Sequence, residues 1–160
     1  MKHRLTAMAA ALALAACAGT HTGPHQPPQE AQTMEKIHSI DSRYGFEETL
    51  SRLREAVQAK GMTVFALIDH REAAQKAGLD MQPATVMVFG TPKAGTPLML
   101  KDPSFALQLP LKVLVTEENG RVKVVFNDTR ALIDGSGIAY AEVENSLAQA
   151  EKLIAKTVSE

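Results

Sequence analysis

Short apolar runs of strand length recur along the chain, and most of them end at a residue that interrupts a strand. They predict five strands, the first of which alternates only weakly: residues 34–40, 62–68, 86–89, 111–118 and 121–127. The run Val86–Phe89 is fully apolar and fits a central, buried strand better than a surface one. These runs supply the sheet of the predicted fold.

The last two runs flank Asn119-Gly120, the dipeptide that most readily adopts the two positive φ values of a type I′ turn. A two-residue turn fixes the register of a hairpin. The expected pairs are Val113 with Phe126, Val115 with Val124 and Glu117 with Val122. One face of the hairpin is then apolar, and the other is only half polar, so it is open to solvent, to a ligand or to another subunit.

Two longer segments carry apolar residues at helical spacing. The first, residues 45–60, is followed by Gly61. The second keeps steps of three or four over about five turns: Tyr140, Val143, Leu147, Ala150, Ile154 and Val158. Short helices are expected at 71–77 and 104–107. Because the long stripes need a sheet to cover, we predict a two-layer α+β domain, in which two main helices cover a mainly antiparallel sheet in the order β-α-β-β-β-β-α.

A segment rich in glycine and proline follows the apolar strand at 86–89. Pro92 and Pro97 fix φ and lack an N–H, while Gly95 permits backbone angles closed to other residues. The pattern therefore predicts a rigid loop over residues 90–96 in place of a helix. Rigid loops at strand ends often carry function, which makes this end of the strand a candidate site.

The first 33 residues differ from the rest of the chain in composition. A basic start precedes an apolar run, residues 5–13, that is too short to span a bilayer as a mature helix. The run ends in Leu14-Ala15-Ala16-Cys17, which resembles a bacterial lipobox. We therefore predict a lipoprotein signal peptide over 1–16, a lipidated Cys17 with a flexible tether over 17–33, and a domain over 34–160. The alternative is an ordinary secretory signal in which the cysteine is incidental.

Cysteine content and charge narrow the classes of function. Cys17 is the only cysteine, so the predicted domain has no disulfide, thiolate nucleophile or cysteine metal ligand. The net charge of −1, with acidic and basic residues interspersed, gives no electrostatic footprint for nucleic acid. The sequence also lacks the usual zinc-protease, serine-hydrolase and phosphate-loop motifs. By analogy with lipoprotein sorting, Ala18 favours an outer-membrane anchor facing the periplasm.

Four polar residues are candidates for binding a ligand: His70, Lys93, Thr96 and Asn127. His70 follows Asp69, the expected cap of a short helix, and is either a ligand or proton-transfer group or a surface histidine beside a cap. Lys93 and Thr96 lie in the glycine-rich segment, which either binds an anion through backbone N–H groups or is purely structural. His70 with Met99 is a candidate soft-metal pair, for copper in particular, although methionines also fill irregular gaps in cores.

Several ordered segments resemble the DUF302 family, a domain of unknown function. They are residues 44–53 (YGFEETLSRL), 61–70 (GMTVFALIDH), 74–78, 89–99 (FGTPKAGTPLM), 109–113 (LPLKV) and 127–128. The resemblance covers about residues 36–130. It implies a compact α+β fold and, by family habit, self-association as a homodimer, but it implies no activity, cofactor or catalytic set.

The sequence therefore predicts an envelope lipoprotein, anchored to the membrane through Cys17, whose domain binds or senses a small ligand or a metal. We assign no catalytic residue and no cofactor. One alternative is an enzyme that uses His70 as acid or base with Lys93 or Asn127 as its polar partner. Another is a structural envelope protein that binds a partner through the half-polar face of the sheet.

Overall fold

The structure, a computed structural model, describes residues 36–160. Its five strands are β1 (Ile37–Asp41), β2 (Thr63–Asp69), β3 (Ala84–Gly90), β4 (Leu111–Glu118) and β5 (Arg121–Asn127). Its helices are α1 (Phe46–Ala59), α2 (His70–Lys76), α3 (Pro92–Lys101), the 3₁₀ helix η1 (Pro103–Leu107), α4 (Thr129–Ile133), α5 (Tyr140–Val143) and α6 (Leu147–Ser159). The predicted signal peptide, Cys17 and tether lie outside the described residues.

The strands form one antiparallel sheet in the order β1-β5-β4-β3-β2. β4 and β5 make the predicted hairpin, in which Asn119 and Gly120 have φ values of 54° and 75°. The expected register is confirmed, because Val113 pairs with Phe126 and Val115 with Val124. The predicted α+β architecture is confirmed as well.

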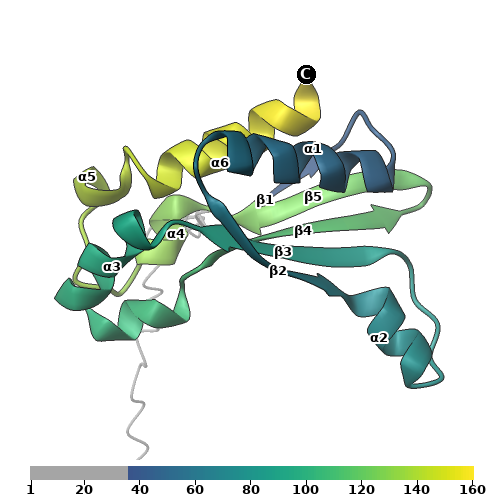
Figure 1. The fold of residues 1–160 in the computed structure, drawn as a ribbon, viewed down its shortest axis with the longest axis horizontal. Helices are drawn as coiled ribbons and strands as arrows, with labels where there is room; N and C mark the ends of the chain where they lie inside the picture. The colour runs from purple at the N-terminus through teal and green to yellow at the C-terminus, as the bar shows by residue number, and fades with distance from the viewer. Residues whose placement is uncertain (1–35) are drawn as a thin grey trace, which may run out of the picture. The chain divides into compact units, whose positions relative to one another are not determined.

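Helices α1 and α6 cover the same face of the sheet (Figure 1). The stripe of α1 and the inward face of the sheet meet in one core, whose fully buried members include Leu53, Val57, Met87, Phe89 and Val113. The opposite face carries half-buried valines and leucines between lysines, so it is half polar as the sequence predicts. Among residues 36–160, no helix combines the length and the apolar composition that crossing a bilayer requires.

The segment expected to be a rigid loop over 90–96 is mostly helix, and that prediction was wrong. Helix α3 begins at Pro92, the first helical position, where a missing N–H costs nothing. Pro97 lies inside the helix and removes one hydrogen bond, but Leu98 beside it is buried in a second apolar cluster. Burial of the helix therefore outweighs the local preference of its glycine and prolines.

The C-terminal stripe is buried as expected, but it belongs to two helices. Ser146, with φ −131° and ψ −83°, separates α5 from α6. Val143 and Leu147 pack in the second cluster, with Leu98, Phe105 and Ile138 as its other buried members. The residues from Ala150 onward pack in the main core. The break thus lets one apolar stripe contact two separate clusters.

Candidate functional site

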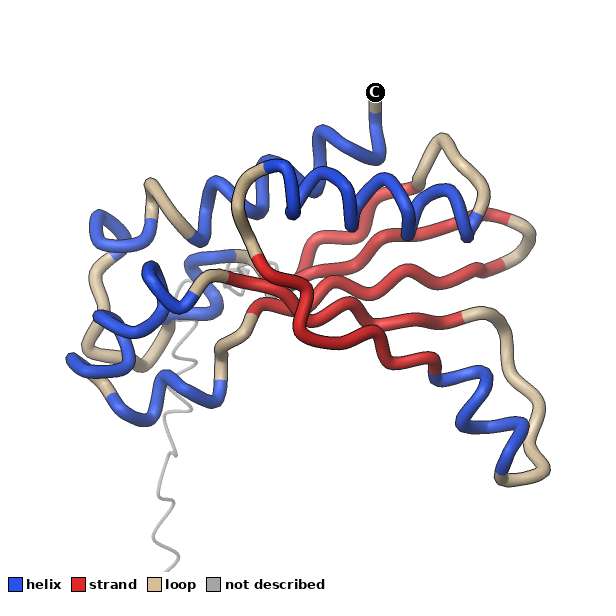
Figure 2. Tube along the Cα trace, viewed as in Figure 1, coloured by secondary structure: helices blue, strands red, loops and turns tan. Residues whose placement is uncertain are grey.

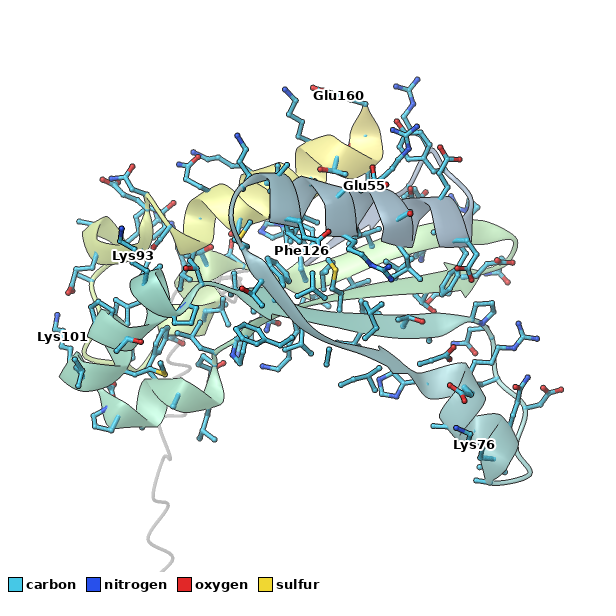
Figure 3. All side chains as sticks on the ribbon, in the orientation of Figure 1. Glu55, Lys76, Lys93, Lys101, Phe126 and Glu160 are labelled. Carbon is cyan, nitrogen blue, oxygen red and sulfur yellow. The ribbon has the colours of Figure 1, made fainter. Side chains whose placement is uncertain are left out.

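The predicted site residues divide between the two ends of the sheet. In the antiparallel pair of β2 and β3, Gly90 lies opposite Thr63, whereas Asp69 lies opposite Thr85. His70 is therefore separated from Gly90 by the whole of β2, about 20 Å at the usual rise of a strand. The tube in Figure 2 shows α2 and α3 at opposite ends of the sheet, and Figure 3 shows the same for Lys76 and Lys93.

His70 and Met99 are consequently not brought together, and neither are His70 and the polar partners proposed for it as an acid or base. His70 is exposed at the first position of α2. Asp69 caps that helix as predicted, since its side chain accepts a hydrogen bond of 2.9 Å from the N–H of Glu72. Asn127 ends β5 at the same end of the sheet as Gly90. A site shared by His70 and Met99 requires the ends of β2 and β3 to be neighbours, and antiparallel pairing places these ends on opposite sides of the sheet.

A cavity of about 190 Å³ lies at the Gly90 end, between α3, the start of β2 and α6. Of the predicted residues, Thr96 and Met99 line it, and Lys93 and His70 do not. The remaining lining is mostly apolar, and its principal members are Met62, Phe65, Gly95, Leu109, Leu147 and Ala150. The cavity therefore offers a site for an apolar ligand, with few polar groups to orient it.

Small residues explain the empty space. α3 presents Ala94 and Gly95 to the cavity, and α6 presents Ala150. A Cβ on Gly95 would lie 3.1 Å from Cδ1 of Leu109, so the glycine also allows this leucine to approach the helix closely. On the opposite wall, a register shift between Val64 and Ala66 marks a bulge that directs Phe65 to the cavity.

The wall formed by α3 is held to α5 by polar contacts. Nζ of Lys101 lies 2.6 Å from Oε2 of Glu142, and hydrogen bonds from Lys101 and from the N–H of Ala139 lower the pKa of Glu142. The pKa of Asp102 is lowered by hydrogen bonds from the Ser104 side chain and from the N–H of Gly137. These contacts tie the end of α3 to the segment before α5.

A second group of polar residues, which the sequence reasoning missed, lies at the same end of the sheet. Nε2 of His38, on β1, is 3.1 Å from Oδ2 of Asp128 and 3.0 Å from Oε1 of Glu151. Asp128 is the N-cap of α4, and Glu151 lies on α6. We call these three residues the His38 cluster. Its side chains are between 24% and 32% exposed, so the cluster is reached from solvent.

In each carboxylate of the cluster, the oxygen that does not contact His38 accepts hydrogen bonds that hold the side chain in place. Oδ1 of Asp128 accepts hydrogen bonds from the N–H groups of Arg130 and Ala131, at 2.7 and 3.1 Å. Oε2 of Glu151 accepts from the N–H and the hydroxyl of Thr129, at 2.9 and 2.6 Å. The cluster is therefore held by the start of α4. Asn127, a predicted ligand residue, lines a small hollow of about 20 Å³ that Glu151 also lines.

The spacing of residues along the sequence does not predict the His38 cluster. His38 lies in the weakest strand pattern, and Asp128 is 90 positions away from it. The one local signal is Asp128, because aspartate is a residue type that commonly caps a helix, and Asp128 caps α4. The pairing of β1 with β5, which places His38 opposite Phe126, brings His38 next to Asp128, and the packing of α6 adds Glu151.

Comparison with known proteins identifies a family and a fold. The family described as "Domain of unknown function DUF302" matches residues 38–159. The crystal structure of an uncharacterized conserved DUF302 protein from Bacillus stearothermophilus is similar, with a TM-score of 0.66 and 25% identity; the match covers 78% of this chain and 96% of that one.

Two curated relatives are named as fluoride-specific ion channels. FluC 1 of Brucella suis biovar 1 and FluC 2 of Brucella melitensis biotype 1 are each 33% identical to this chain over 103 residues. The matches cover 64% of this chain but only 41% and 38% of those proteins. The chain thus spans about two fifths of the length of these relatives.

Proposed function

Because the chain belongs to the DUF302 family, a family of domains of unknown function, we propose a function from the geometry of the site. The domain binds a small apolar molecule in the cavity between α3, β2 and α6. The observation that carries this proposal is a cavity of about 190 Å³ with a mostly apolar lining, kept open by small residues on two facing helices. Ligand sites in proteins are commonly concave and largely apolar with few polar groups.

The volume limits the ligand. An engineered apolar cavity of about 150 Å³ is large enough to bind benzene, so this cavity accepts a molecule of that size or slightly larger. Thr91 and Thr96 are the lining residues on the α3 side that carry a hydroxyl group, and they are available to hydrogen-bond a polar group on the ligand. A charged ligand has no ionic partner there, because the lining contains no charged residue.

The proposed location of this activity is the surface of a membrane. The support is the lipobox ending at Cys17, together with the matched Brucella proteins, which are named as ion channels. Fluoride itself is not the ligand that we propose for the cavity, because a small hydrated anion gains nothing from an apolar lining.

The ligand proposal is tested with benzene as the probe on the full-length protein in lipid nanodiscs. We expect benzene to raise the melting temperature in a saturable manner, because a ligand that binds only the folded state stabilises it. Ala94→Leu places a larger side chain in the cavity and is expected to abolish the shift. Sodium fluoride is expected to leave the melting temperature unchanged.

The matched control is Ala73→Leu, the same substitution on the exposed surface of α2. Both variants are measured in the same bilayer, so partition of benzene into lipid affects them equally. Ala73→Leu should keep the full shift. An equal shift in Ala94→Leu and Ala73→Leu, or no shift in the wild type, refutes the cavity as the binding site.

The anchor is tested separately. Metabolic labelling with a fatty acid should mark the wild-type protein, and Cys17→Ser should remove the label and leave unprocessed precursor. An unlabelled wild-type protein recovered away from membranes would contradict the anchor while leaving the cavity proposal intact.

A further inference from the structure

We propose that the His38 cluster is a binding site for a divalent transition-metal cation, with Zn²⁺ as the representative ion. The site is independent of the apolar cavity and of its ligand. Its donors are one imidazole nitrogen and two carboxylate oxygens, contributed by β1, the start of α4 and α6. Imidazole with carboxylates is a donor set that borderline divalent metals accept.

The spacing of the donors fits a shared cation. Nε2 of His38 lies 3.0 and 3.1 Å from the two carboxylate oxygens. All three donor atoms lie within 4.8 Å of one another. Two ligand atoms that are each about 2.1 Å from a metal are about 3.4 Å apart at the tetrahedral angle that zinc prefers. The donors are therefore close enough to share one ion after a shift of a few tenths of an ångström between His38 and each carboxylate.

The charge of the cluster also calls for a cation. Among the ion pairs of residues 36–160, Asp128 and Glu151 contact only His38 and no lysine or arginine. Arg130, the basic residue next to the cap, lies over the ring of Tyr140 at 3.8 Å. One imidazole nitrogen carries at most one proton, so the two oxygens that face it, Oδ2 of Asp128 and Oε1 of Glu151, have one donor between them. The two positive charges of a divalent ion would balance the negative charges of both carboxylates.

The orientation of each donor is set before any ion arrives. The N–H groups at the start of α4 fix Asp128, Thr129 fixes Glu151, and the His38 ring packs on Phe126 with ring centres 5.1 Å apart. Thr129 is 2% exposed, so it acts as a buried support behind the ligand. Partial exposure of the three donors leaves room for water as a further ligand.

The test is titration of the full-length protein with Zn²⁺, read by calorimetry and by melting temperature. The variants are Asp128→Asn and Glu151→Gln. Asn caps a helix about as well as Asp, so the first variant keeps the start of α4 while weakening the ligand. We expect each variant to weaken Zn²⁺ binding at least tenfold and to lose the rise in melting temperature that Zn²⁺ gives the wild type.

The matched control is Asp102→Asn, which changes another cap that lies outside the cluster, at the start of η1. It should bind Zn²⁺ as the wild type does. His21 and His25 lie outside the described residues and are unchanged in every variant, so the difference between variants is the readout. Equal binding in all four proteins, or a wild-type melting temperature that Zn²⁺ does not raise, overturns the proposal and leaves the cluster as a histidine ion pair.

Discussion

The two ends of the sheet differ in how the chain leaves it. At one end, β4 passes into β5 through Asn119-Gly120, and β2 passes directly into α2, a helix with no buried residue. At the other end, the chain passes through α3, η1, α4 and α5 (Figure 2). The second apolar cluster, the cavity and the His38 cluster lie at this end.

The difference shows where local sequence suffices and where it does not. The hairpin turn and the start of α2 at the first end are determined by residues next to one another in the chain, whereas the two sites at the second end depend on contacts between segments far apart. Both proposed sites lie at the second end. A substitution at the second end should therefore reduce the stability of the fold more than a substitution at the turns.

Phe105→Ala should be the most damaging of these changes. Phe105 is 2% exposed at the centre of the second cluster, and truncation of a buried phenylalanine typically costs about 3–5 kcal/mol. Urea denaturation of the full-length protein measures the loss. Leu107→Ala in the same 3₁₀ helix is the control, because Leu107 is 82% exposed and should change stability by no more than about 0.5 kcal/mol. Similar losses in both variants would show that the second cluster is not a cohesive core.

Gly120→Val tests the opposite end. Gly120 has a φ of 75°, and a residue with a side chain costs about 1–2 kcal/mol in the left-handed region. Thermal denaturation should show the loss. Gly137→Val is the control, because no atom lies within 4 Å of a Cβ added there and its φ is not in the left-handed range. If both variants melt alike, the positive φ of the turn does not limit stability.

Asp69→Ala should have a smaller effect, because α2 contributes no buried residue to a core. Loss of a helix cap costs about 0.5–2 kcal/mol, and the exposed setting places this one toward the lower limit. Amide exchange should accelerate in α2 and remain unchanged in α3. Asp80→Ala, in the exposed segment that follows α2, serves as the control. Faster exchange in α3 would mean that the two ends are coupled.

Acid should weaken the contacts that hold α3 to α5. The pKa values of Asp102 and Glu142 are lowered in the folded protein, chiefly by hydrogen bonds from Ser104 and Lys101. Their contribution is therefore complete above the ordinary carboxyl pKa near 4 and is lost as the pH falls through the lowered values.

Asp102→Asn should remove part of this dependence. The difference in unfolding free energy between wild type and variant should shrink as the pH is lowered below about 4. Asp80→Asn should show no such trend. A difference that stays constant down to pH 2 would argue against the lowered pKa of Asp102.

Sequence reasoning was reliable wherever a short segment determines its own structure. The dipeptide Asn119-Gly120 correctly predicted the turn and register of the hairpin, and Asp69 was correctly predicted to cap α2. It failed at α3, where the glycine and prolines were read as breakers although Pro92 suits a helix start and Leu98 is buried. The break at Ser146 was also invisible, because the apolar spacing continues through it.

The candidate sites were harder to predict because they depend on strand pairing. Thr96 was predicted from the glycine- and proline-rich segment in which it lies, whereas Met99 was predicted as a metal partner of His70; both residues line the cavity. His70 was joined to them only by assuming that two strand ends are adjacent, and the antiparallel register separates them. His38 was not predicted as a site residue, because its partners Asp128 and Glu151 are about 90 or more positions away in the sequence. No local sequence pattern predicts a contact over that separation.

The position of β1 has a consequence for the order of folding. Among residues 36–160, β1 is the first strand along the chain, yet its one partner there is β5, from Ile37 with Asn127 to Asp41 with Lys123. Such a non-local pairing forms slowly, because a long loop must close before the contact is gained, whereas the hairpin it joins is local. We therefore expect β1 to dock late, onto a hairpin already formed. His38 then meets Glu151 only after α6 has been synthesised and packed, so metal uptake at the proposed site would report that both β1 and α6 have docked.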